Sequence, residues 1–343
     1  MNGRQIVSAA LSGKSTSQVG CGPLAVHFCA RQAGRSIRDY TTDATALSDS
    51  VLFYCEKYRP DVVWISADTW VSAEAMGATV DFPGDEQPMC GMGEPVIQTP
   101  ADIDRIPPAD PQSQGRQPLM LEALERVAQQ IGDEVFVVAC FDQSPFSLAC
   151  AMAGINEVMI KLIDDMVMVE ALLGRCVEYA TAYGLAMADR GAHMLSTGDS
   201  PAGMIGPQLY HDVVQPAEQQ VFQSIKRHTE AFVSLHICGD TTPLLPAMAT
   251  SGADVLELDH QVDLAEACRT VGSDVAVWGN LDPVSVLARG DAQTVRDKTN
   301  QTIDAVSQAG HKRFVLSSGC TLTPDTPEDN LRALFETARQ RSL

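Results

Sequence analysis

The feature that most constrains the fold is a repeated alternation of a short, apolar, β-rich run with a segment of helical pattern. Several runs are continuously apolar, as at 135–140, which is typical of strands buried on both faces of a parallel sheet. Eight strand and helix alternations predict an α/β protein built as a (β/α)8 TIM barrel. The expected strands are 23–28, 61–67, 134–141, 192–196, 231–238, 254–259, 274–279 and 313–318.

The chain of 343 residues has no low-complexity linker and no visible long repeat, so we expect one barrel domain over 1–343. The main irregularity is a long insertion after the second strand. Within it, 74–100 is predicted to be a loop or hairpin and 119–131 a helix. A long insertion at the loop face of a barrel can shape a substrate entrance.

Composition excludes several partners. The formal charge of −20, from 24 basic and 44 acidic residues, repels phosphate backbones and anionic membrane surfaces. No apolar run approaches a membrane span, and 6–11 is too short for a signal peptide. The ten cysteines are scattered singly, which favours reduced thiols. We therefore expect a cytoplasmic protein with neither a nucleic acid nor a membrane as partner.

Polar residues stand at the carboxyl ends of nearly all the expected strands, where barrel enzymes carry their catalytic groups. Asp68, Asp199 and Asn280 are the catalytic candidates. Asp199 ends a strand in a glycine-containing loop, so it can hydrogen-bond a substrate, orient a ligand or simply cap the next helix. Asn280 has the same two interpretations. The full set of strand-end residues is Asp68, Asp142, Asp199, His236, Cys238, Asp259, Asn280 and Cys320.

Three of these residues form a candidate metal site. His236 and Cys238 are two apart on one strand, so they share a face at about 6–7 Å spacing and can meet one ion. A closed barrel brings Cys320, at another strand end, to the same mouth. A Cys2His set suits zinc and leaves a fourth position open, as in catalytic sites. The alternative is that His236 is a satisfied core histidine and the cysteines are buried thiols.

The sixth expected strand offers two carboxylates as a fourth ligand. Glu257 and Asp259 lie on one face, and Asp259 is favoured because it stands at the end of the strand. Two thiolates cancel the formal charge of zinc, and a carboxylate would make the site negative. Such a site weakens Lewis acidity but leaves a bound substrate thiolate electron-rich, which favours alkyl transfer to sulfur over hydrolysis.

Several segments, taken in order, resemble the uroporphyrinogen decarboxylase superfamily across nearly the whole chain. The resemblance implies a (β/α)8 barrel, and the superfamily includes zinc-dependent methyltransferases that work with corrinoids. The segments are 30–35 (ARQAGR), 66–68 (SAD), 74–77 (EAMG), 144–149 (SPFSLA), 279–283 (GNLDP) and 324–330 (PDTPEDN).

The chain departs from the decarboxylase pattern at two positions. It retains Arg31, Arg35 and Asp68, which by resemblance contact the carboxylates and pyrrole nitrogens of a porphyrinogen. Arg31 and Arg35 would share one helical face and bind substrate anions, or they are ordinary surface arginines. However, Ala151 replaces the expected tyrosine and Cys320 stands where decarboxylases carry histidine. Decarboxylation is therefore disfavoured.

The methyltransferase branch fits better, because its signature is His-x-Cys followed much later by Cys. His236, Cys238 and Cys320 match it, and Asp259 stands where that branch has an acidic ligand. The resemblance implies a zinc enzyme that moves a methyl group from a corrinoid to a thiol such as coenzyme M. Alternatives are methyl transfer from a methylated substrate to Co(I), a decarboxylase-like lyase and a non-catalytic zinc-binding barrel. A separate corrinoid protein is the expected partner, because no cobalamin-binding domain is evident.

Overall fold

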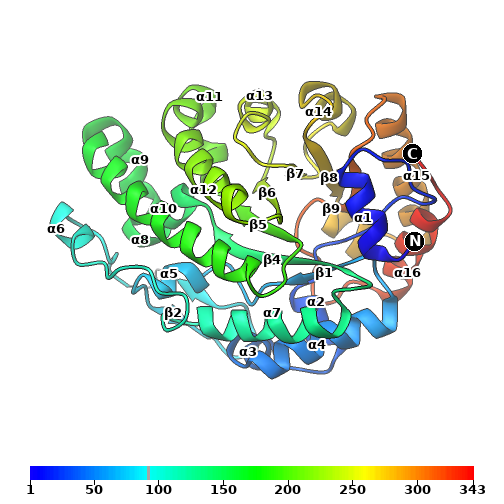
Figure 1. The fold of residues 1–343 in the computed structure, drawn as a ribbon, viewed down its shortest axis with the longest axis horizontal. Helices are drawn as coiled ribbons and strands as arrows, with labels where there is room; N and C mark the ends of the chain where they lie inside the picture. Colours follow the sequence, from blue (N-terminus) through cyan, green and yellow to red (C-terminus); the bar gives the residue numbers. More distant parts are fainter. Residues whose placement is uncertain (91–92) are drawn as a thin grey trace.

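The computed structural model describes residues 1–90 and 93–343, and its centre is a curled sheet of seven parallel strands with helices outside it (Figure 1). The strands lie side by side in the order β1-β4-β5-β6-β7-β8-β9. Their bounds are β1 (Val62–Ile65), β4 (Phe136–Gln143), β5 (Met194–Gly198), β6 (Phe232–Ile237), β7 (Val255–Leu258), β8 (Ala276–Leu281) and β9 (Phe314–Ser318).

Helices α1 to α4 precede β1, and from there on helices alternate with strands and cover the outer face of the sheet (Figure 1). Helix α1 instead packs against the interior side chains at the amino-terminal end of the strands. The α-helices are α1 (Gly3–Leu11), α2 (His27–Gln32), α3 (Ile37–Thr42), α4 (Ala44–Tyr58), α5 (Val71–Ala75), α6 (Pro100–Ile103), α7 (Gln117–Ile131), α8 (Pro145–Ala153), α9 (Ile155–Asp164), α10 (Met166–Ala188), α11 (Gly206–Leu209), α12 (Gln215–His228), α13 (Leu245–Met248), α14 (Leu264–Thr270), α15 (Ala292–Gln308) and α16 (Glu328–Arg339). Short 3-10 turns are η1 (Ser200–Met204) and η3 (Thr242–Leu244), and π-helical turns are η2 (Tyr210–Val214) and η4 (Pro283–Ala288).

In the described part of the chain no single helix is both long and apolar enough to cross a membrane. The pair α8 and α9 passes that test only when joined, and the two are bent by 106° at their break.

The barrel architecture predicted from the sequence is confirmed, and seven of the eight expected strands are present. The insertion also matches, with a hairpin of β2 (Val80–Asp81) and β3 (Met89–Cys90) and with helix α7 in the predicted places. Residues 91 and 92 of the predicted hairpin region lie outside the described residues. Continuous apolar runs identified these strands because both faces of each are covered, by side chains inside and by helices outside.

The first expected strand, 23–28, is wrong. Helix α2 begins at His27, and the extended part of the segment lies just upstream, where Cys21 forms an isolated parallel bridge with Leu316 of β9. The Cys21 amide also donates to the Asp61 carboxylate at 3.0 Å, immediately before β1. The upstream segment 19–22 thus spans the gap between the two edges of the curled sheet. Short apolar runs do not distinguish a strand from the buried face of a helix.

Gly22 is the point at which this closure is tightest. Its carbonyl oxygen accepts hydrogen bonds from the indoles of Trp64 and Trp278, at 3.2 and 3.3 Å, and from the Ser317 hydroxyl at 2.9 Å. The two tryptophan rings meet edge to face with centroids 5.8 Å apart and fill the bore of the barrel. A Cβ on Gly22 would lie 2.5 Å from Cγ2 of Val62, so no other residue fits without movement.

A buried pair of carboxyl groups fixes the end of β5 against α12. Asp199 and Glu218 are both fully buried, and their side chains share a hydrogen bond. The other Asp199 oxygen accepts from the amide and hydroxyl of Ser147, while Glu218 accepts from Tyr210 at 2.6 Å. Burial raises the pKa of both acids, that of Asp199 to about 7, so one proton is retained between them.

We expect Gly22→Ala to destabilise the protein by about 1–3 kcal/mol, because the added methyl group must displace Val62 and Trp278. Urea unfolding measures the change. Gly174→Ala is the matched control: Gly174 is exposed on α10 with open space around its Cβ position, so alanine should stabilise by roughly 0.5–1 kcal/mol. Equal effects at the two glycines would contradict this account of the closure.

The carboxyl pair predicts a pH dependence of stability. The folded state holds the proton of Asp199 more tightly than the unfolded chain does, so the free energy of unfolding should fall as the pH rises from about 4 through 7. Glu218→Gln replaces the shared proton by an amide and should flatten this fall. Urea unfolding at several pH values tests it, with exposed Glu170→Gln as the control. A slope unchanged in Glu218→Gln would contradict the interpretation.

Candidate metal centre

His236, Cys238 and Cys320 come together at the carboxyl ends of the strands. His236 lies in β6, Cys238 follows directly after that strand, and Cys320 lies two residues beyond the end of β9. Their ligand atoms are all within 4.8 Å of one another, and Nε2 of His236 is 3.1 Å from Sγ of Cys238. The curl of the sheet therefore joins residues that are far apart in the sequence, as the strand-end rule predicts.

The backbone fixes the orientation of the imidazole. Nδ1 of His236 lies 2.9 Å from the carbonyl oxygen of Glu257 on the neighbouring strand β7. A carbonyl can only accept, so Nδ1 carries the proton and Nε2 is directed toward the two sulfurs. This second-partner arrangement is the usual one for a histidine that binds a metal through Nε2.

The three side chains are strongly coupled. The hydrogen bond from Cys320, together with His236, lowers the pKa of Cys238 to about 4, so Cys238 is a thiolate. Burial disfavours a charged His236, but the hydrogen bond and the charge of Cys238 outweigh it and raise its pKa to about 9. The pKa of Cys320 is raised, chiefly by its hydrogen bond to that thiolate. The site thus already holds one anionic sulfur, aimed at the same point as two further donors.

These donors fit zinc. Two sulfurs and one imidazole nitrogen are soft or borderline ligands, and three protein ligands leave a tetrahedral ion one further position. Among the described residues, the cluster of potential metal ligands consists of these three residues and does not include Asp259 or Glu257, the two candidates for a fourth ligand. Asp259 accepts from the amides of Gly239 and Gln261, each at 3.0 Å, and so braces the loop after Cys238. Glu257 accepts from the hydroxyls of Ser196 and Ser234.

A cavity of about 800 Å³ opens beside the three ligands. Residues from four of the central strands, β4 to β7, from loops after the strands and from helices α8 and α9 line it. Apolar side chains such as Trp70 and Ile155 supply most of the exposed surface, although half of the lining residues are polar or charged. The lining residues are Leu24, Val26, Ser66, Thr69, Trp70, Cys90, Cys140, Asp142, Gln143, Ser147, Cys150, Ala151, Gly154, Ile155, Asn156, Glu157, Ser196, Thr197, Gly198, Ser200, Pro201, His236, Cys238, Glu257, Cys320 and Thr321.

The three residues proposed as catalytic from their strand-end positions do not line this cavity. Asp68 forms a buried ion pair with Arg116 and accepts from the Trp70 amide at 2.8 Å. Asp199 belongs to the buried carboxyl pair. Asn280 donates to the carbonyl oxygens of Asp259 and Val262, both at 2.9 Å. Each supports a loop that borders the metal centre or the cavity.

Arg31 and Arg35, the predicted anion-binding residues, are also outside the lining. Arg31 pairs with Asp85 at 2.8 Å, and Arg35 lies 3.8 Å from Asp49, in both cases with exposed side chains. The helical pattern did not predict these partners, because Asp85 comes from the insertion and Asp49 from α4.

Sequence reasoning missed several residues of the region. Arg116 precedes α7 in the insertion and binds both Asp68 and Glu74, and no motif marked it. Gln143 ends β4 and lines the cavity, and the rule that selected Asp142 could have found it. Ser200 hydrogen-bonds Cys238 and helps to lower its pKa, but nothing in the sequence relates the two positions.

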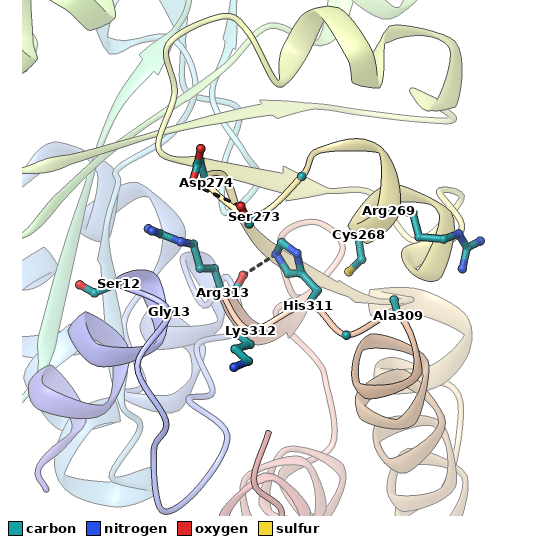
Figure 2. A pocket seen from close by; sticks show the side chains of 12 residues that line it. Ser12, Gly13, Cys268, Arg269, Ser273, Asp274, Ala309, His311, Lys312 and Arg313 are labelled. Atoms are coloured by element: carbon teal, nitrogen blue, oxygen red, sulfur yellow. Dashed lines mark hydrogen bonds between the residues drawn. The ribbon is translucent and has the colours of Figure 1, made fainter.

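A second cavity, of about 630 Å³, lies at the opposite end of the barrel, before β8 and β9 (Figure 2). Its cations Arg269, Lys312 and Arg313 point away from one another rather than toward a common point (Figure 2). His311 lies 3.1 Å from the Arg313 carbonyl oxygen. No set of chemical groups converges there, and the amino-terminal end of a barrel is where structural roles prevail.

Two solved structures resemble this fold. A methyltransferase from Methanosarcina mazei aligns with a TM-score of 0.89 at 21% identity, over 99% of both chains. A B12-independent methionine synthase from Shewanella aligns with a TM-score of 0.58 at 13% identity, over 86% of this chain and 87% of that one. At these identities the likeness concerns the fold.

The sequence comparisons agree with the resemblance seen in the motifs. A uroporphyrinogen decarboxylase from Nostoc sp. is 31% identical over 293 residues, covering 83% of this chain and 80% of that protein. The family model described as Uroporphyrinogen decarboxylase (URO-D) matches residues 3–341. The chain therefore belongs to the URO-D family.

Proposed function

We propose that this protein is a zinc-dependent methyltransferase that passes a methyl group between a corrinoid and a thiol. The observation that carries the proposal is the convergence of His236, Cys238 and Cys320 on the wall of a cavity at the catalytic end of the barrel. A zinc ion held by these ligands would lower the pKa of a substrate thiol and keep its sulfur electron-rich, because two protein thiolates already offset the charge of the ion.

The residues of this chain do the positioning. Cys238 supplies a sulfur that is already anionic before a metal binds. The Glu257 carbonyl keeps the imidazole of His236 turned toward the sulfurs. Asp259 holds the loop after Cys238, and Ser200 hydrogen-bonds the sulfur of Cys238. In the proposed reaction the substrate sulfur would form a bond to the methyl carbon as the methyl group leaves its corrinoid carrier, and the carrier would keep the electron pair of the broken bond.

The corrinoid would be carried by a separate protein that docks over the cavity. The same geometry serves the related half-reaction, in which a methylated substrate gives its methyl group to Co(I). The partner, the direction of transfer and residence in the cytoplasm are part of the proposal and rest on the family resemblance.

A decarboxylase is the second candidate, supported by relatives that bear that name. Against it stand the arginines that would bind porphyrinogen carboxylates, because Arg31 and Arg35 form surface ion pairs outside the cavity. Ala151 lines the cavity where the decarboxylases carry a tyrosine. Carbon dioxide release from uroporphyrinogen at a rate above that of the methyl transfer would favour the decarboxylase.

The first prediction from the metal centre concerns metal content. Purified protein should bind about one zinc per chain, and Cys320→Ala should weaken the affinity by more than about 100-fold, since losing a ligand costs more than losing its supporting partner. Elemental analysis and competition with a chelator measure both quantities. Cys268→Ala, a buried cysteine outside the site, is the matched control. Equal zinc affinity in the two variants would contradict the assignment.

The second prediction concerns activity. Zinc-loaded protein should demethylate methylcobalamin in the presence of a small thiol, which changes the visible spectrum of the corrinoid. Metal-free protein and Cys320→Ala should lose at least about 100-fold in rate, because the thiol is no longer activated. Cys268→Ala should retain the rate. Undiminished activity of the metal-free protein would refute the zinc mechanism.

A further inference from the structure

The cavity beside the metal centre lacks a feature that a site for anionic substrates needs. None of its lining residues is a lysine or an arginine, whereas three are acidic: Asp142, Glu157 and Glu257. The two residues outside the described ranges, Gly91 and Met92, carry no charge. His236 is also among the lining residues, but it belongs to the candidate metal centre, where its Nε2 lies 3.1 Å from Sγ of Cys238.

The buried guanidinium of Arg116, which acts electrostatically on Asp142, does not supply the missing charge. Arg116 is not among the lining residues, and it binds two carboxylates, Asp68 and Glu74, and stacks over the ring of Phe82 at 4.9 Å. With one positive and two negative charges, this cluster is itself negative. Zinc at the three ligands would add no net positive charge either, because Cys238 and Cys320 bind metals as thiolates.

The buried carboxyl group of Asp142 responds differently to ligands of opposite charge. Burial raises the pKa of Asp142, and only weak hydrogen bonds from Ser72 reach its carboxyl oxygens in the described part of the chain. A cationic ligand would allow this group to ionise and would offset its charge. An anionic ligand would meet no positively charged side chain in the cavity, so no attraction would offset the free energy needed to remove it from water. Glu157, exposed at the mouth, adds a further negative charge.

We propose that the substrate of this cavity, thiol or methyl donor, carries no carboxylate, sulfonate or phosphate group and that a cationic head is favoured over a neutral one. This inference rests on the proposed function, because it assumes that the ligand enters beside the metal. It separates this chain from relatives that act on anionic acceptors such as coenzyme M, a sulfonate.

The test compares three thiols that share a two-carbon spacer and a tetrahedral head: thiocholine, 3,3-dimethylbutane-1-thiol and 2-mercaptoethanesulfonate. Isothermal titration calorimetry of zinc-loaded protein at low ionic strength gives each affinity, corrected for the fraction of thiolate in solution. The sulfonate should bind at least roughly tenfold more weakly than the neutral thiol, and thiocholine should bind most tightly. A sulfonate that binds most tightly overturns this inference and leaves the proposed function standing.

A charge reversal at the mouth provides an independent arm. Glu157→Lys should narrow the gap in affinity between thiocholine and the sulfonate, measured as the ratio of their dissociation constants, by at least about threefold. The reason is that the mouth of the cavity then carries the opposite charge. Glu170→Lys makes the same change of net charge on an exposed part of α10 outside the cavity and should leave the gap unchanged. Equal shifts in the two variants would contradict the inference. Failure of all three thiols to bind would refute the proposed function itself.

Discussion

The rest of the structure depends on the contact of the Gly22 backbone with the interior of the barrel. One carbonyl oxygen there accepts hydrogen bonds from Trp64 near the first edge of the sheet, from Trp278 in β8 and from Ser317 in β9. Together with the bridge between Cys21 and Leu316, this contact holds the two edges of the sheet together around a filled bore. Because β9 carries Cys320 toward β6, the same closure brings the third sulfur to within ligand distance of the other two.

Support for the metal centre is spread over the loops at the carboxyl ends of the strands. Asp259 braces the turn after Cys238, Asn280 holds the loop that contains Asp259, and Asp199 ties the start of η1 to α12. These polar residues are buried or half-buried and hydrogen-bonded, so their charges and amides position the backbone instead of meeting the ligand. The arrangement explains how a solvent-facing pair of cysteines keeps a defined geometry.

Sulfur ligands and a cavity without arginine or lysine point in the same chemical direction. A site with two thiolates is a poor place for hydrolysis and a suitable one for an electron-rich sulfur nucleophile. Acidic residues without a lysine or an arginine among the lining side chains support the proposal that the space beside it disfavours anions. Membership of the URO-D family accordingly fixes the scaffold, while the residues that line the cavity are the basis for proposing methyl transfer instead of decarboxylation.

The sequence by itself determined the barrel, seven of its strands and the candidate metal residues His236, Cys238 and Cys320, which the structure brings together, because strand periodicity and strand-end position are local properties. Only the tertiary structure decided that 23–28 is not a strand. The extended part of the chain lies just before this segment, because Gly22 packs against residues from both edges of the sheet. It also decided that Arg31, Arg35, Asp68 and Asp199 face ion pairs or buried partners. Their partners, such as Arg116 and Glu218, come from distant segments, and the side chain a residue meets there cannot be read from its own neighbourhood in the sequence.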